Sequence, residues 1–145
     1  MKIMTSSDNP RFRGLLKLAQ SSRERRSAGL SLLDGIHLVA AYAERVGAPG
    51  EIVLSRSGAE SAEVRMLLAA QGIDDALLLS DALFRQLSSV ATPTGIMAVV
   101  PTPRVAVPDR LTGSGVWLED IQDPGNVGSI LRSAAAAGLQ CRPDR

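Results

Sequence analysis

The chain has 145 residues, of which 45% are hydrophobic and 21% charged, which is enough for one ordinary domain or for one small domain and part of another. Its formal net charge of +1 gives no sign of a strongly basic or acidic partner for the chain as a whole. The single cysteine excludes an intramolecular disulfide, no Cys/His cluster has metal-ligand spacing, and no apolar run approaches the roughly 18 residues of a membrane helix, so we expect a cytoplasmic protein without a metal or a membrane partner.

The positive charge is concentrated at the start of the chain. Residues 1–26 hold seven basic side chains against two acidic ones, whereas the remainder holds nine basic and thirteen acidic. Asn9 followed by Pro10 predicts the start of a helix. Apolar residues then recur at helical spacing, at Phe12, Leu15, Leu16 and Ala19. The pattern predicts an amphipathic helix with a basic outer side, continuing into the charged run of residues 23–26.

Two interpretations of this basic segment stay open. Charge runs usually form a solvated helix face, but clustered cations also form surfaces that bind phosphates. No aromatic residue interleaves the arginines to stack on bases. Under the second interpretation, the phosphate-binding residues are Arg11, Arg13, Lys17, Arg23, Arg25 and Arg26.

Strands and helices alternate through the next part of the chain. Apolar runs predict strands at 30–33, 51–54, 76–79 and 95–100, and helical periodicity predicts helices at 36–46, 59–71 and 81–90. Asp34 and Gly35 close the first strand, and Ser80 with Asp81 caps the last helix. His37 has no partner in sequence and is more often structural than catalytic in such a setting. The alternation predicts a layered α/β domain.

A proline-rich stretch then predicts a boundary. Pro101, Pro103 and Pro108 indicate a stiff linker over 101–110, separating residues 1–100 from residues 111–145. Beyond it, Val116–Leu118 is a short apolar run that predicts a strand buried on both faces of a parallel sheet. The turn at residues 123–126 leads into a helix, with Asn126 as its predicted N-cap.

The helix after Asn126 has two unlike sides. Val127, Ile130 and Leu131 share its apolar side, while small residues and Arg132 share the other. An arginine on a helix leans toward the N-terminus, where unpaired N–H groups favour an anion. An ordinary strand-to-helix turn with a solvated arginine explains the same pattern without any function.

The pattern of residues 123–138, Asp-Pro-Gly-Asn-x-Gly-x-Ile-x-Arg-x-Ala and a closing Gly138, resembles the first conserved motif of the SpoU-type (TrmH-like) RNA methyltransferases of the knotted SPOUT class. Residues 6–10, 23–26, 33–39 and 92–96 resemble the N-terminal substrate-binding domain of the same family, whose fold is similar to ribosomal protein L30e. Family members more often carry Glu where this chain has Asp34. This departure leaves the role of that carboxylate open.

The resemblance implies an L30e-like α/β/α substrate-binding domain over 1–100, followed over 111–145 by the first strand-helix unit of an incomplete SPOUT (knotted Rossmann-like) domain. It implies S-adenosylmethionine-dependent methylation of a ribose 2′-hydroxyl in tRNA or rRNA, with the six basic residues contacting RNA. Arg132 and Asn126 match the family's catalytic motif. Guanidinium keeps its proton, so Arg132 is expected to position a phosphate and stabilise the forming alkoxide, while Asn126 orients the loop.

The family's second and third motifs, which bind S-adenosylmethionine and form the knot, have no match in this chain. The cofactor-binding residues are therefore unknown, and we expect residues 1–145 alone to bind no methyl donor and to be inactive. Family members pair as homodimers through the knot, which makes dimerisation of this chain doubtful. A non-catalytic RNA-binding module of L30e-like fold is the alternative function. A small-molecule-binding protein is a third, but no phosphate-binding loop supports it.

Overall fold

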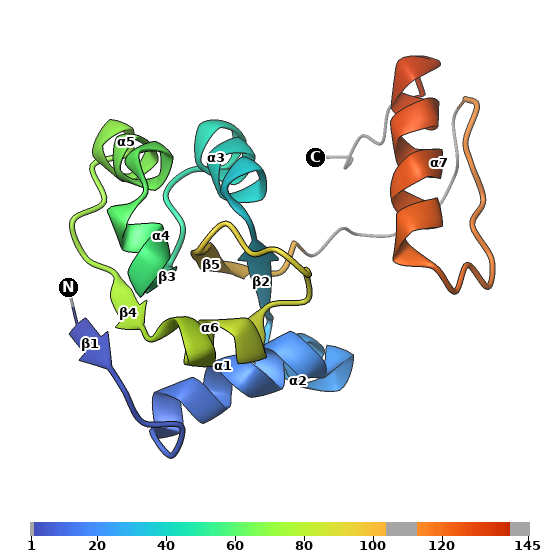
Figure 1. The fold of residues 1–145 in the computed structure, drawn as a ribbon. Coiled ribbons are helices and arrows are strands. Elements are labelled where there is room, and N and C mark those ends of the chain that lie inside the picture. Colours follow the sequence, from blue (N-terminus) through green and yellow to red (C-terminus); the bar gives the residue numbers. More distant parts are fainter. Residues whose placement is uncertain (1, 104–112, 140–145) are drawn as a thin grey trace. The chain divides into compact units, whose positions relative to one another are not determined.

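The computed structural model describes residues 2–103 and 113–139 and divides the chain into two compact units, Met1–Thr102 and Pro103–Arg145 (Figure 1). Most of the linker expected at 101–110 lies outside the described residues. Pro101 still pairs with Leu30 in the sheet, and the Thr102 N–H donates to the Gly29 carbonyl at 2.9 Å. The first residues of the expected linker therefore continue the first unit.

The first unit is built from a five-stranded sheet and six helices, and α7 is the helix of the described part of the second unit. The strands are β1 (Lys2–Met4), β2 (Leu30–Asp34), β3 (Glu51–Ser55), β4 (Leu77–Leu79) and β5 (Ile96–Pro101). The helices are α1 (Pro10–Gln20), α2 (Ser22–Ala28), α3 (Ile36–Arg45), α4 (Arg56–Glu60), α5 (Ala62–Ala70), α6 (Asp81–Leu87) and α7 (Pro124–Ala136). In the described part of the chain, no helix is long and apolar enough to cross a membrane.

The strand order is β1-β4-β3-β5-β2. β1, β4 and β3 run parallel, and β5 runs antiparallel to both β3 and β2. β3 and β5 each have a strand on both sides, and almost all of their side chains are buried. The four strands predicted in this unit are confirmed. β1 was not predicted, because three residues are too few to show a period.

Helices cover both faces of the sheet, because the side chains of β5 alternate between two apolar clusters. Met97 and Val99 join residues of α1 and α6, namely Phe12, Leu15, Leu18, Leu83, Phe84 and Leu87. Ile96, Ala98 and Val100 join residues of α3 and α5, namely Ile36, Val39 and Val64. Figure 1 shows these helices as two layers around the strands. The predicted α/β/α layering of the first unit is confirmed.

Several helix boundaries follow from local hydrogen bonds. Asn9 caps α1 as predicted, with its Oδ1 accepting from the Arg11 N–H at 2.8 Å. The single helix predicted at 59–71 is wrong, because Ser61 is extended and separates α4 from α5. The helix predicted to reach residue 90 ends at Leu87, since the Ser88 hydroxyl and the Ser89 N–H both bond to Asp34.

Asp34 therefore ties the end of β2 to the connection between α6 and β5. Its Oδ2 accepts from the Ser88 hydroxyl at 2.7 Å and from the Ser89 N–H at 3.2 Å. Its Oδ1 is buried and has no hydrogen-bond partner among the described residues. The sequence left the role of this carboxylate open. In the structure its role is to link the end of β2 to the segment between α6 and β5.

The second unit departs from prediction in two ways. Val116–Leu118 forms no strand, and Trp117 is 82% exposed, because no described strand of that unit offers a hydrogen-bonding edge. The helix begins at Pro124, with Asp123 as its N-cap and Asn126 in its first turn. Pro124 suits the first helical position, where its missing N–H is not needed, so capping shifts three residues upstream of Asn126.

Two glycines allow the residue before β5, Gly95, to lie directly against the backbone of α4 at Gly58. A Cβ at Gly95 would lie 2.5 Å from the Gly58 Cα and 2.6 Å from the Ser55 Oγ, and its φ is +83°. A Cβ at Gly58 would lie 2.2 Å from the Gly95 carbonyl oxygen. The Ser55 N–H donates to that same oxygen at 2.9 Å. Neither position has space for a side chain.

Gly95→Ala is expected to lower the free energy of unfolding by more than about 2 kcal/mol, because it combines a backbone clash with a left-handed φ. Gly72→Ala is the matched control: its φ is +62°, but nothing lies within 4 Å of the added Cβ, so it should cost only about 1 kcal/mol. Gly14→Ala, in open space within α1, should be neutral or stabilising. Urea unfolding measures all three, and equal losses for Gly95→Ala and Gly72→Ala would contradict the role of the contact.

Candidate functional site

Arg132 folds back along α7 toward the helix N-terminus, as expected for a long side chain on a helix. Its Nη2 donates to the Ser129 Oγ at 3.1 Å, and its Nη1 would lie 3.2 Å from a Cβ built at Gly128. Gly128 thus gives the guanidinium room to lie against the helix. No residue of α7 is buried, so this guanidinium is open to a ligand.

The first turn of α7 is held by Asp123, whose Oδ1 accepts from the Gly125 N–H at 2.7 Å. Asn126 is exposed in that turn. No hydrogen bond joins Asn126 to Arg132 among the described residues. The two predicted catalytic residues share one helix without touching, and their catalytic roles stay predictions.

Three of the six predicted phosphate-binding residues are engaged within the protein. Arg11 forms a two-pronged ion pair with Glu51, with its Nε 3.2 Å from Oε1. Arg13 pairs with Asp8 at 2.8 Å. The Nη1 of Arg25 donates to the carbonyl oxygens of Leu18 and Ala19, at 2.7 and 3.1 Å, at the C-terminal end of α1. Cations in such positions complement the helix dipole and stabilise the structure.

The other three, Lys17, Arg23 and Arg26, are exposed and form no hydrogen bond or ion pair with a described residue. We call these three the free cations. They lie at the C-terminal end of α1 and on α2, which is where the positive charge of the first 26 residues is available to an anionic partner.

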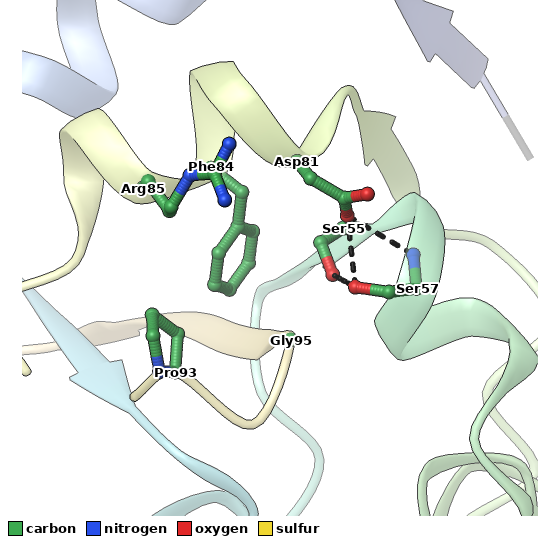
Figure 2. Close-up of a pocket in the computed structure, with 7 residues that line it drawn as sticks. All are labelled: Ser55, Ser57, Asp81, Phe84, Arg85, Pro93 and Gly95. Atoms are coloured by element: carbon green, nitrogen blue, oxygen red, sulfur yellow. Dashed lines mark hydrogen bonds between the residues drawn. The ribbon is translucent and has the colours of Figure 1, made fainter. Parts of the chain in front are cut away.

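The structure also contains a pocket that sequence analysis did not find (Figure 2). It encloses about 180 Å³ and is lined by Ser55, Ser57, Asp81, Phe84, Arg85, Pro93 and Gly95. Ser55 ends β3, and Asp81 begins the helix that follows β4. The pocket therefore sits beyond the carboxyl ends of two parallel strands, the usual ligand position in α/β sheets.

A hydrogen-bond network fixes the polar side of this pocket. Asp81 Oδ1 accepts from the Ser57 N–H at 3.0 Å and from the Ser57 hydroxyl at 2.9 Å. The Ser57 hydroxyl lies 3.1 Å from the Ser55 Oγ, and the Ser55 Oγ accepts from the Gly58 N–H at 2.8 Å. The backbone hydrogen bond from Ser57, and then its hydroxyl, lower the pKa of Asp81. The carboxylate is therefore firmly ionised near neutral pH.

A sequence signal for this pocket did exist. Ser55 directly follows one short apolar run, and Asp81 stands one residue beyond another. Both runs predict parallel strands. Polar residues at those positions meet at one edge of a sheet. The sequence alone predicts Asp81 only as part of a helix cap and assigns no role to Ser55.

Residues 9–98 match the family of the MRM3-like substrate binding domain. An uncharacterised tRNA/rRNA methyltransferase from Synechocystis sp. is 32% identical over 94% of this chain and 50% of its own length. The 23S rRNA (guanosine(2553)-2′-O)-methyltransferase RlmP of Bacillus subtilis is 29% identical over 96% of this chain and 52% of its own length. The chain spans about half the length of these relatives.

Solved structures of methyltransferases also superpose on this chain, and the chain again covers about half of each. An RNA 2′-O ribose methyltransferase superposes with a TM-score of 0.68 at 26% identity, covering 94% of this chain and 52% of that one. The SpoU methyltransferase AviRb of Streptomyces viridochromogenes, in complex with the cofactor AdoMet, superposes with a TM-score of 0.67 at 26% identity, covering 90% of this chain and 50% of that one.

Asp81→Asn tests the electrostatic part of the pocket network. The folded pKa of Asp81 lies below its ordinary value of 3.8, so its contribution to stability is fully present above that value and is lost as the pH falls through the folded pKa. The substitution should lower the free energy of unfolding by about 1 kcal/mol near pH 7 and by progressively less toward about pH 2.

Urea unfolding across this pH range measures the difference. The control is Asp74→Asn, which removes an exposed carboxylate elsewhere in the first unit and should leave stability nearly unchanged at every pH. A penalty for Asp81→Asn that persists undiminished in acid would show that its ionisation contributes nothing.

Proposed function

The chain belongs to the SpoU-type (TrmH-like) RNA methyltransferase family through its MRM3-like substrate binding domain, and we propose that it serves the S-adenosylmethionine-dependent methylation of a ribose 2′-hydroxyl in tRNA or rRNA. The match over residues 9–98 is the observation that carries this proposal. It coincides with the compact first unit, which supports assigning RNA recognition to that unit. The second unit then supplies residues for the reaction.

The first unit contacts RNA through its free cations. Phosphate contacts position a protein on RNA, and each contact adds affinity that salt weakens. Lys17, Arg23 and Arg26 are exposed and uncommitted, so binding a phosphate costs them no internal ion pair. Arg11 and Arg13 would have to leave Glu51 and Asp8 first, so they contribute less.

Arg132 contacts the RNA at the site of the reaction. Its guanidinium keeps its proton, so it does not act as a general base. A fixed cation instead holds a phosphate by a forked pair of hydrogen bonds and stabilises negative charge that develops on the ribose oxygen. Asn126, one turn or more upstream on the same helix, orients the RNA at the helix N-terminus, while Asp123 maintains the turn.

AviRb is solved in complex with the cofactor AdoMet, which supports the same methyl donor for the reaction that this chain serves. The roles proposed for Arg132, Asn126 and the free cations are roles toward the RNA.

A non-catalytic RNA-binding module is the second candidate function. It is favoured by the uneven distribution of buried side chains, since both apolar clusters belong to the first unit. Both candidates require RNA binding through the free cations. Only the methyltransferase function requires methyl transfer to depend on Arg132.

Replacing the three free cations by glutamine should weaken RNA binding by residues 1–145 and flatten its salt dependence. Each lost phosphate contact lowers the slope of log K against log salt by about 0.7 to 0.9, so the slope should fall by about 2 to 3. Filter binding with rRNA across a salt series measures this slope. The control removes the same charge elsewhere, by Arg45→Gln, Arg56→Gln and Arg65→Gln on α3, α4 and α5, and equal slopes for the two triple variants would contradict the assignment.

Arg132→Ala tests the catalytic proposal in a chimera that joins this chain to the part of the Bacillus subtilis relative that it does not match. Removing one fixed positive group that stabilises a developing oxyanion should lower kcat for methyl transfer to 23S rRNA by about 100-fold. Arg132→Lys should be intermediate, because lysine keeps the charge but loses the forked geometry. Unchanged turnover for Arg132→Ala, relative to the unsubstituted chimera, would exclude this role.

A further inference from the structure

The pocket at the carboxyl ends of β3 and β4 offers one anionic and one cationic group in a fixed arrangement. Asp81 begins α6, and Arg85 follows four residues later, so both side chains stand on the same side of that helix. Figure 2 shows the Phe84 ring between them and Pro93 opposite. The Asp81 carboxylate, an apolar wall and the Arg85 guanidinium thus line one hollow.

Asp81 has accepting capacity left after its internal hydrogen bonds. A carboxylate accepts about four hydrogen bonds, and two donors from Ser57 go to Oδ1. The side chain of Ser55 also helps to lower the pKa of Asp81. Because these serines hold the carboxylate in place and keep it ionised, its remaining accepting capacity suits a neutral hydroxyl donor, and its charge repels a phosphate.

The size of the pocket limits the ligand. Its volume of about 180 Å³ is below the roughly 300 to 1,000 Å³ of most small-molecule sites, so it admits one sugar and part of a base rather than a whole cofactor. Phe84 is only 1% exposed and so forms the floor rather than a stacking platform. Arg85 is exposed at the rim, where it can meet a phosphate without drawing it toward Asp81.

We propose that this pocket binds the ribose of a single unpaired ribonucleotide, with the Asp81 carboxylate accepting a hydrogen bond from the 2′-hydroxyl and Arg85 contacting the adjoining phosphate. The close backbone contact of Gly95 with Gly58 brings Gly95 to the pocket wall beside Ser55. The 2′-hydroxyl is the group by which a protein distinguishes RNA from DNA at a given position. This inference rests on the proposed RNA-binding function and adds to it a point of ribose recognition separate from the free cations.

Nuclear magnetic resonance on residues 1–145 tests the proposal with uridine 5′-monophosphate and 2′-deoxyuridine 5′-monophosphate. The ribonucleotide should shift the backbone amide signals of Ser57, Asp81 and Gly95 and should bind about tenfold more tightly than the deoxyribonucleotide, since one hydrogen bond to a charged group is at stake. Equal affinities, or shifts confined to other residues, would overturn it. Inorganic phosphate should leave the Ser57 and Asp81 signals in place.

Two variants separate ribose recognition from a purely structural role of the Ser57–Asp81 network. Asp81→Asn should reduce ribonucleotide affinity about tenfold, to the level of the deoxyribonucleotide. Arg85→Gln, which leaves that network intact, should weaken both nucleotides equally and keep their ratio. Glu63→Gln and Arg65→Gln on α5 are the charge-matched controls and should change neither affinity. A ribose preference that survives Asp81→Asn would overturn the proposal.

The same measurements distinguish this inference from the proposed function. The triple glutamine variant of the free cations should bind both mononucleotides with unchanged affinity, although it binds rRNA weakly. If the mononucleotides show no ribose preference while rRNA binding remains dependent on the free cations, the pocket assignment fails alone. If rRNA binding is also independent of the free cations, the proposed function fails with it.

Discussion

The architecture of the first unit depends on the backbone contact between Gly58 and Gly95. Because neither residue carries a side chain, the chain just before β5 lies directly against α4, and the Ser55 N–H reaches the Gly95 carbonyl. The ends of β3 and β4 and the segment before β5 thereby converge. The polar groups of Ser57 and Asp81 and the ring of Pro93 line one hollow because of this contact.

The two units are stabilised by different means. In the first unit, the strands of one sheet send side chains into two apolar clusters, so α1, α3, α5 and α6 are held by long-range packing. In the described part of the second unit, α7 is defined by local features, namely the Asp123 cap and Pro124 at its first position. The first unit is therefore held by tertiary packing, whereas α7 is specified by residues close to it in the chain.

The sequence predicted what depends on local periodicity and missed what depends on distant partners. The helix at 36–46 and the strand at 51–54 were correct, because their apolar spacing extends over enough residues. β1 was missed because its pairing with β4 is long-range, and a strand at Val116–Leu118 was wrongly predicted because an apolar run does not supply its own edge. The pocket beside Asp81 could not be located from the sequence. The residues that line it belong to segments far apart in the chain, which only the order of the strands in the sheet brings together.

The ion pairs along α1 and α2 make the accessible positive charge of this segment uneven. Arg11 and Arg13, near the start of α1, are paired with carboxylates, and Arg25 donates to carbonyl oxygens at the end of α1. The free cations of the segment therefore lie together toward α2. A polyanion approaching this segment is attracted most strongly to that end before any contact is made.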